Sequence, residues 1–277
     1  LLDRYSLKDE KGEPVEHSPE EIWTRVAWGL AQIEKTPEQR KVWEKKYYEI
    51  MEDFHFVPAG RILSGAGTGY AVTYYNCYVI PSPDDSRGGI IDSLKDMVEI
   101  MARAGGVGMN LSSLRPKGSY IKTVNGHSSG PMAWAQLYSV ATGDVISQGG
   151  SRRGALMLMM DDDHPDIEEF ITCKQTPHWI EHANLSIAAS DGFMQAIKDD
   201  ADWDLKWRGE VMKTVKARHL WDLITTAAWK SAEPGFVFME RYNKWSNTWY
   251  YEDIRCTNPC GEQGLGPWSV CNLGSLN

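Results

Sequence analysis

The segment GALMLMMDDDHPDIEEFITCKQTPHWIEHANLSIAASDGFMQAIKD, residues 154–199, decides the fold class. Two short apolar runs, at 154–160 and 184–188, are typical of strands. Each run is followed by a stretch with helical spacing, at 167–174 and 192–199. Strands that alternate with helices in this way indicate a parallel sheet with crossover helices. The segment therefore predicts an α/β fold.

The same alternation continues on both sides of this segment. Further strands are expected at 74–80, 107–111 and 236–239, and further helices at 93–103 and 220–231. The sequence shows no internal repeat and no long linker, so a single α/β body is predicted over residues 57–277.

The first part of the chain has a different pattern. Ser18 followed by Pro19 is typical of a helix start, because Ser is a favoured N-cap and Pro fits the first helical turn. Apolar residues then recur at helical spacing, and a second helix is expected over 37–54. Residues 1–56 are therefore predicted to form a small helical region.

Composition excludes several classes of protein. The chain has 277 residues, of which 42% are hydrophobic and 24% charged, so it can bury a core and is not expected to be disordered. Its net charge of −9 and the lack of a basic stretch argue against nucleic-acid binding. No apolar run is long enough to span a membrane, and the first residues lack the basic and apolar regions expected of a signal peptide. The chain has neither an initiator Met nor a polar C-terminal tail, so we expect a piece of a longer protein.

The five cysteines are the best candidates for chemistry. An odd number of thiols in a chain of this size indicates a reducing cytoplasm, although buried, inert cysteines are the alternative. Cys256, Cys260 and Cys271 do not have zinc-ribbon spacing. In Asn258-Pro259-Cys260-Gly261-Glu262, an extended loop would place the amide, the thiol and the carboxylate on one side. This arrangement would let a nucleophile and a general base face one substrate.

Other motifs have weaker interpretations. The Gly-rich stretch 147–154 contains Arg152 and Arg153, which suit phosphate or base contacts if the stretch is not simply a surface loop. Residues 178–182 match the HxxEH zinc pattern, but too little helix surrounds them, and no metal site is predicted. The acidic segment 161–164 is expected to be a solvated turn that caps the helix at Pro165. The Gly-dense segments 65–69 and 105–108 are interpreted as tight turns.

Taken together, these motifs resemble the catalytic subunit of ribonucleotide reductases, closest to the adenosylcobalamin-dependent (class II) branch. The finger-loop signature of that family resembles Asn258 to Glu262 and Cys271 to Ser275. The resemblance covers nearly the whole chain, and the other segments that carry it are 75–79, 115–118, 128–131, 148–155, 164–167 and 184–186. It implies the N-terminal half of the family's ten-stranded α/β barrel, with the second half absent.

The resemblance also implies catalytic roles. Cys260 would form the thiyl radical that abstracts the ribose 3′-hydrogen, Glu262 would deprotonate the 3′-hydroxyl, and Asn258 would hydrogen-bond the sugar hydroxyls. Cys77 and Cys271 would be the dithiol that reduces the substrate and closes to a disulfide, which requires their sulfurs to come about 2 Å apart.

Substrate and effector residues follow from the same resemblance. Substrate contacts are implied at Asn76, Gly105 and Ile62, although Arg61-Ile62-Leu63 departs from the family's Pro-Thr-Leu and lacks its hydroxyl. An allosteric deoxynucleoside triphosphate would be bound by Asp85, Ser86 and Arg115, with Gln148 and Arg153 on the loop that relays its identity to the substrate. No ATP-cone is recognised before the helical region.

The implied cofactor is adenosylcobalamin, and the alternative is a radical from a metal-containing partner subunit. The implied partners are a ribonucleotide substrate, as diphosphate or triphosphate, a thioredoxin- or glutaredoxin-type reductant and a second copy of the chain in a homodimer. Two other hypotheses stay open. The chain could be an inactive or split nucleotide-binding subunit that needs a partner with the rest of the barrel, or a metal hydrolase built on His178, Glu181 and His182.

Overall fold

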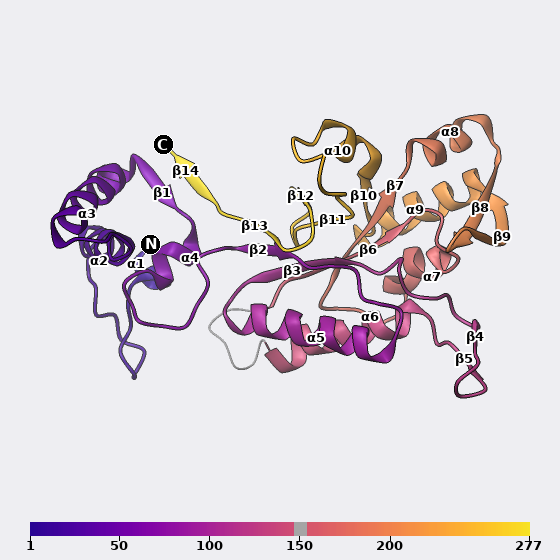
Figure 1. Cartoon of the computed structure of the whole chain (residues 1–277), viewed down its shortest axis with the longest axis horizontal. Helices are drawn as coiled ribbons and strands as arrows, with labels where there is room; N and C mark the ends of the chain where they lie inside the picture. The colour runs from indigo at the N-terminus through magenta and orange to yellow at the C-terminus, as the bar shows by residue number, and fades with distance from the viewer. Residues whose placement is uncertain (147–153) are drawn as a thin grey trace. The chain divides into compact units, whose positions relative to one another are not determined.

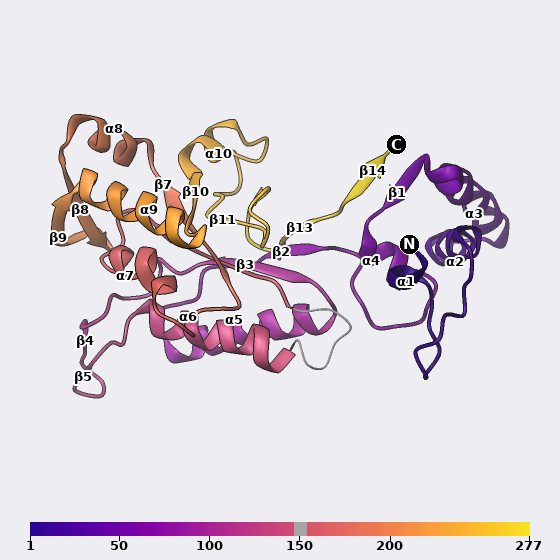
Figure 2. The ribbon, with the colours of Figure 1, turned by 180° about the vertical axis from the view of Figure 1, so that it is seen from behind.

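The computed structural model describes residues 1–146 and 154–277 (Figures 1 and 2). The chain divides into two compact units. Unit 1 comprises residues 1–76, 103–105 and 270–277, and unit 2 comprises residues 77–102 and 106–269.

Unit 1 is mainly helical, as the first part of the sequence predicts. The Ser18 side chain accepts a hydrogen bond from the Glu21 N–H and so caps the first long helix, while Thr36 and Gln39 form a capping box at the second. Apolar side chains on the facing sides of these helices form the core together with Met51 and Leu63. The elements are α1 (Leu2–Tyr5), α2 (Pro19–Ala31), α3 (Pro37–Met51), η1 (Glu52–Phe54), β1 (Phe56–Pro58), α4 (Gly60–Gly65) and β14 (Gly274–Leu276).

Unit 2 is built on a sheet of parallel strands. The strand order is β10-β7-β6-β3-β2, and each of these strands is parallel to its neighbour. Their bounds are β2 (Cys77–Val79), β3 (Gly106–Asn110), β6 (Leu156–Asp161), β7 (Asn184–Ala189) and β10 (Gly235–Phe238). Every residue of β3 is buried, and so is nearly every residue of β6 and β7. Strands covered on both faces need continuous apolar sequences, which explains the runs seen in the sequence.

Helices connect and cover these strands. Figures 1 and 2 show α5 and α6 side by side, and the Tyr138 hydroxyl of α6 donates a hydrogen bond to the Ile90 carbonyl of α5. The helical elements are α5 (Arg87–Ala102), α6 (Pro131–Val140), the π-helical η2 (Ala141–Ile146), α7 (Ile167–Thr172), η3 (Cys173–Gln175), α8 (Asp191–Asp199), α9 (Ala217–Ser231) and α10 (Met239–Trp245).

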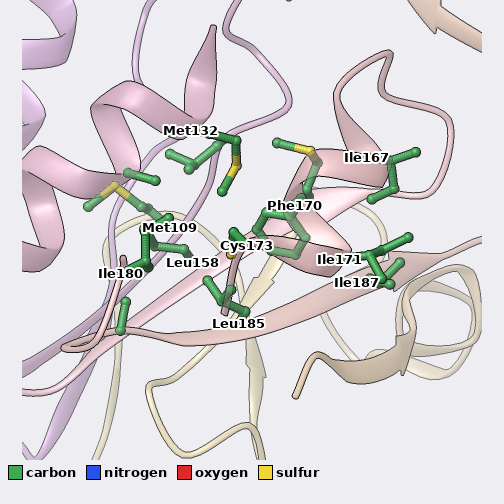
Figure 3. Close-up of a cluster of buried hydrophobic side chains, with 14 of the residues drawn as sticks. Met109, Met132, Leu158, Ile167, Phe170, Ile171, Cys173, Ile180, Leu185 and Ile187 are labelled. Carbon is green, nitrogen blue, oxygen red and sulfur yellow. The ribbon is translucent and has the colours of Figure 1, made fainter. Parts of the chain in front are cut away.

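The main core of unit 2 lies between the sheet and its helices. Figure 3 shows Leu158 and Leu185 of the strands close to Phe170 and Cys173 of the segment that follows β6. Phe170 and Leu158 are fully buried. Burial of each large apolar side chain contributes about 1.5–3 kcal/mol to the free energy of folding. This core is therefore the main source of stability for the unit.

Short antiparallel pairs complete the chain. They are β4 (Tyr120–Ile121) with β5 (Gly126–His127), β8 (Asp202–Trp207) with β9 (Glu210–Lys216), and β11 (Cys256–Thr257) with β12 (Gly264–Leu265). A last short strand, β13 (Ser269–Cys271), runs from unit 2 into unit 1 along the chain.

The parallel α/β fold is confirmed, but several predicted boundaries are wrong. The strand predicted at 74–80 is only Cys77–Val79, the helix predicted at 93–103 begins at Arg87, and the helix predicted at 37–54 ends at Met51. That last helix stops at Met51 because Glu52 leaves the helical conformation, with a ψ of 141°. The β8–β9 hairpin and α10 were not predicted. Nearly all residues of β9 are exposed, so it lacks the alternation that marks a half-buried strand. The boundary after residue 56 stays a prediction.

Candidate active site

The motif Asn258 to Glu262 forms the turn of a β-hairpin. Strands β11 and β12 pair antiparallel, and the Asn258 N–H extends the pairing by donating to the Gln263 carbonyl at 3.0 Å. The Gly261 N–H donates to the Asn258 carbonyl at 3.0 Å, which closes the turn. Gly261 has a φ of +84°, a conformation that favours glycine.

The prediction of an extended loop is therefore wrong. The buried Asn258 side chain holds the turn from within: its Oδ1 accepts from the Gln263 N–H at 3.0 Å, and its Nδ2 donates to Glu262 Oε1 at 2.5 Å. An Asn side chain that bonds the backbone favours a turn over an extended segment. The predicted proximity of the amide and the carboxylate nevertheless holds, because the turn joins them directly.

The hairpin is seated on the parallel sheet of unit 2. The Asn184 Nδ2, at the start of β7, donates to the Pro259 carbonyl at 2.8 Å. Gly106 and Gly108 of β3 lie under the hairpin so closely that an added Cβ would come 2.8 Å from Pro259 and 2.0 Å from the Thr257 carbonyl oxygen. Glycine at these positions lets the hairpin backbone approach the strand.

Cys260 lies exposed at the tip of this hairpin, and its thiol has a neighbour from a distant part of the chain. Burial of part of the side chain and the nearby charge of Glu262 raise the pKa of the Cys260 thiol, while a side-chain hydrogen bond with Cys77 lowers it. The structure thus brings together Cys77, Asn258, Cys260 and Glu262. A thiol that stays protonated can act as a hydrogen-atom donor, whereas ionic nucleophilic chemistry would require a thiolate.

The other cysteines of unit 2 are buried. Burial raises the pKa of Cys256 strongly, and its Sγ donates to the Thr257 carbonyl at 3.2 Å. Burial also raises the pKa of Cys173, to about 12, in the main core. The inert interpretation of the cysteines therefore describes these two thiols and not Cys260.

Unit 1 holds the remaining predicted catalytic cysteine and the predicted substrate residues. The Asn76 N–H donates to the Cys271 carbonyl at 3.1 Å, so these two residues are adjacent. The Asn76 Oδ1 is buried and accepts no hydrogen bond from the described part of the chain. Gly105 is buried, and Ile62 packs against the helical core of unit 1.

Unit 2 also contains a pocket of about 790 Å³ between the start of α5, the β4–β5 hairpin and the start of α6. The predicted effector residues Asp85, Ser86 and Arg115 all line it. The Arg115 Nε lies 3.0 Å from both carboxylate oxygens of Asp85, and this hydrogen bond raises the pKa of Arg115. Positive groups at Arg87 and Lys122 line the same pocket. Gln148 and Arg153 lie outside the described residues.

The two motifs that suggested metals have other structures. His178 and Ile180 have positive φ, so residues 178–182 form turns rather than the helix that an HxxEH zinc site needs. His178 pairs with Glu181 at 3.1 Å. Within residues 1–146 and 154–277, no group of three or more His, Cys, Asp or Glu side chains is placed to hold a metal ion.

The predicted solvated acidic turn at 161–164 is wrong. Asp162 and His164 are buried, and the following helix begins at Ile167 without a side-chain cap. Asp162 Oδ2 accepts a hydrogen bond from the Ser190 N–H at 2.5 Å. Burial raises the pKa of Asp162 to about 7. Packing of the β8–β9 hairpin over the turn excludes solvent, as the 3.1 Å hydrogen bond from Trp203 Nε1 to the Asp162 carbonyl shows.

Comparison with known families agrees with this geometry. The family model described as the ribonucleotide reductase barrel domain matches residues 75–277, and the one described as the ribonucleotide reductase all-alpha domain matches residues 1–71. The chain belongs to the ribonucleotide reductase large-subunit family. The α/β class and the helical region before the barrel are thereby confirmed.

Individual reductases show the same relationship. The chain is 39% identical to a vitamin B12-dependent ribonucleoside-diphosphate reductase of Thermoplasma acidophilum over 84% of this chain and 30% of the relative. It is 35% identical to one of Mycobacterium tuberculosis over 100% of this chain and 40% of the relative. A ribonucleoside-diphosphate reductase large subunit of variola virus is 29% identical over 93% and 37%. The chain therefore spans 30–40% of the length of these curated relatives.

The resemblance to ribonucleotide reductases predicted from sequence is thus confirmed. Sequence analysis named the segments that contain Asn184 and Gly108 but missed that these residues position the hairpin, a role that depends on contacts with a distant segment. The interpretation of 105–108 as a tight turn is wrong, because Gly106 to Gly108 belong to the buried strand β3. In the described residues, no helix is both long enough and apolar enough to cross a membrane.

Proposed function

We propose that this chain is part of a ribonucleotide reductase catalytic subunit that converts ribonucleoside diphosphates, or triphosphates, to 2′-deoxyribonucleotides. One observation carries the proposal: the exposed Cys260 thiol lies at the tip of a rigid hairpin beside Cys77, with the Glu262 carboxylate in the same turn. A thiol, a second thiol and a carboxylate around one point fit radical reduction of a sugar better than hydrolysis.

In the proposed reaction, Cys260 is first oxidised to a thiyl radical and takes the 3′-hydrogen atom of the ribose. Glu262 accepts the 3′-hydroxyl proton, and the 2′ C–O bond breaks with its oxygen leaving as water after protonation by the dithiol. Cys77 and Cys271 supply two electrons and become a disulfide. Cys260 finally returns a hydrogen atom to C3′. The sum is ribonucleotide plus dithiol giving deoxyribonucleotide, water and disulfide.

Asn258 acts mainly as a positioning residue in this scheme. Its Nδ2 already donates to Glu262 and its Oδ1 accepts from the Gln263 backbone, so it fixes both the carboxylate and the turn. Substrate hydroxyls would share these groups. We propose that the Asn76 side chain, whose Oδ1 is buried, and the Gly105 backbone also contact substrate, and that Ile62 lines its site.

The proposed cofactor is adenosylcobalamin, which supplies the radical that oxidises Cys260. The relatives named vitamin B12-dependent support it. The exposure of Cys260 fits a radical source that approaches from outside these residues. Because a metal-containing partner subunit would also use an exposed thiol, that source is the alternative.

We also propose that the pocket lined by Asp85, Ser86 and Arg115 binds an allosteric deoxynucleoside triphosphate, with Gln148 and Arg153 relaying its identity. Its volume of about 790 Å³ lies in the range of small-molecule sites, and its cationic side chains suit phosphates.

We further propose that the protein is reduced by a thioredoxin- or glutaredoxin-type protein, forms a homodimer and is located in the cytoplasm. All five cysteines are thiols rather than disulfides, which supports a reducing compartment.

The deciding experiment is Cys260→Ser in the complete enzyme. We expect reductase activity to disappear while deoxynucleoside triphosphate binding is kept, because the hydroxyl cannot form the radical and the pocket is elsewhere. The matched control is Cys173→Ala, which removes a buried thiol from the main core and should leave turnover within a few-fold. Turnover retained by Cys260→Ser would refute the assignment.

A further inference from the structure

The β8–β9 hairpin ends in a turn with an unusual residue. Trp207 pairs with Glu210, and the two residues between them, Arg208 and Gly209, have φ of 51° and 83°. Two consecutive positive φ values define the two-residue turn for which Asn-Gly is favoured. An arginine is disfavoured in the left-handed conformation at the first position, because its Cβ lies too close to the following carbonyl oxygen. The turn geometry therefore gives no reason for Arg208, and its side chain needs another explanation.

The Arg208 side chain reaches the wall of the nucleotide pocket. Its guanidinium lies 4.3 Å from the centre of the Trp207 ring, and its Nη2 lies 3.4 Å from Asp85 Oδ2. Asp85 lines the pocket and has a side chain only 6% exposed, whereas that of Arg208 is 66% exposed. Arg115 binds the same carboxylate, so two guanidinium groups share one buried negative charge.

The body of the hairpin is held without Arg208. The Lys206 N–H donates to the Asp163 carbonyl at 2.6 Å, Leu205 is fully buried, and Lys213 forms an ion pair with Glu168. These contacts lie along the strands rather than at the tip. Replacement of Arg208 should therefore change the charge near the pocket and leave the hairpin folded.

The charge balance shows what Arg208 adds. A buried carboxylate in the wall would repel a polyphosphate, and Arg115 alone only neutralises it. The second guanidinium at Asp85 adds to the positive groups of Arg87 and Lys122 and so makes the wall more positive. Electrostatic attraction between the wall and a ligand then increases with the number of phosphates that the ligand carries.

We propose that Arg208 is a positioning residue that acts through Asp85 and tunes the pocket to nucleotides carrying several phosphates. This inference rests on the proposed effector function of the pocket and adds the β8–β9 hairpin to it. The exposed contact of Arg208 is weak by itself, as surface ion pairs usually are, so its effect is on ligand affinity rather than on stability.

The test measures binding of dTMP, dTDP and dTTP to the full chain and to Arg208→Asn by calorimetry. Asn suits the positive φ, so the variant should be as stable as the wild type or slightly more so. We expect a loss of affinity that grows from dTMP to dTTP, reaching roughly 5–10-fold for dTTP, as one partly screened charge contact implies. Arg208→Lys should recover most of the dTTP affinity.

The control is Arg241→Ala, which removes another exposed arginine that pairs with Asp191 outside the pocket. It should leave all three affinities unchanged. Equal dTTP affinity in Arg208→Asn and wild type, or an equal loss for all three nucleotides, would overturn the role of Arg208 while leaving the effector pocket intact. Absence of binding by the wild-type chain would overturn both proposals.

Discussion

The Cys77 thiol hydrogen-bonds the Cys260 sulfur, although the two residues belong to segments far apart in the sequence. Cys77 begins β2, and Cys260 lies in the turn between β11 and β12. A hydrogen atom can pass only between groups in close proximity. This contact therefore connects the proposed radical residue with Cys77, one of the two proposed reducing thiols.

The first prediction concerns the disulfide. After one turnover with substrate under anaerobic conditions and without external reductant, Cys77 and Cys271 should be joined, because the reduction takes two electrons from this pair. Peptide mapping after alkylation of the remaining thiols measures the linkage. Cys173 and Cys256, which are buried, should be recovered as thiols once the protein is unfolded. Recovery of both Cys77 and Cys271 as free thiols after turnover would contradict the assignment.

The second prediction concerns Glu262→Gln. The glutamine oxygen can still accept the hydrogen bond from Asn258, so the turn should persist, but the base is lost and turnover should fall roughly 10²–10⁴-fold. Because the Glu262 charge raises the pKa of Cys260, its removal should lower that pKa and speed alkylation of Cys260 by iodoacetamide near pH 8.

Glu240→Gln is the matched control for this variant. Its carboxylate accepts a hydrogen bond from the Asp191 N–H outside the site, so neither turnover nor alkylation of Cys260 should change. Slower alkylation in Glu262→Gln would show that the charge does not act on Cys260 as the structure indicates.

The third prediction concerns the seat of the hairpin. In Gly108→Ala the new Cβ would lie 2.0 Å from the Thr257 carbonyl oxygen, so β3 or the hairpin backbone must move. Overpacking of this kind costs about 1–3 kcal/mol and should also reduce turnover. Gly192→Ala in α8 is the control, since its Cβ would make only an ordinary 3.6 Å contact with Trp203. Urea denaturation measures the free energy of unfolding of both variants, and equal stabilities would argue against the close approach.

The fourth prediction concerns Asp162. Burial raises its pKa to about 7 from 3.8, so the folded protein holds a proton that the unfolded chain releases as pH rises. Its contribution to stability is therefore complete below about pH 4 and is lost progressively up to about pH 7. Asp162→Asn should remove this loss. The free energy of unfolding of the variant minus that of the wild type should therefore be about 1–4 kcal/mol larger at pH 8 than at pH 4. If the difference in free energy of unfolding between wild type and variant does not change with pH, the raised pKa of Asp162 is disproved.

Part of the fold could be predicted because its signals are local. Ser18 and Pro19 mark the start of α2 through capping chemistry that involves only neighbouring residues. Strands β6 and β7 were visible because burial on both faces requires an apolar residue at nearly every position. The exposed strand β9 imposes no such requirement on its residues and was missed.

The candidate site was predictable in its composition but not in its form. The order Asn258, Cys260, Glu262 identified the family motif, yet the extended loop inferred from it is a turn closed by the Asn258 side chain. Bonds from one side chain to its own loop compete with extended structure, and spacing alone does not show which prevails.

By itself, the sequence determined which residues can do chemistry and that the chain has a helical region followed by a parallel α/β body. Only the tertiary structure decided that Cys77 is the neighbour of Cys260, that Cys256 is buried while Cys260 is exposed, and that Arg208 reaches Asp85. The physical reason is that desolvation and contact between distant segments arise when the chain packs. Burial and contacts of a side chain depend on which residues pack against it from other strands or hairpins, and the spacing of residues in the sequence does not show these neighbours.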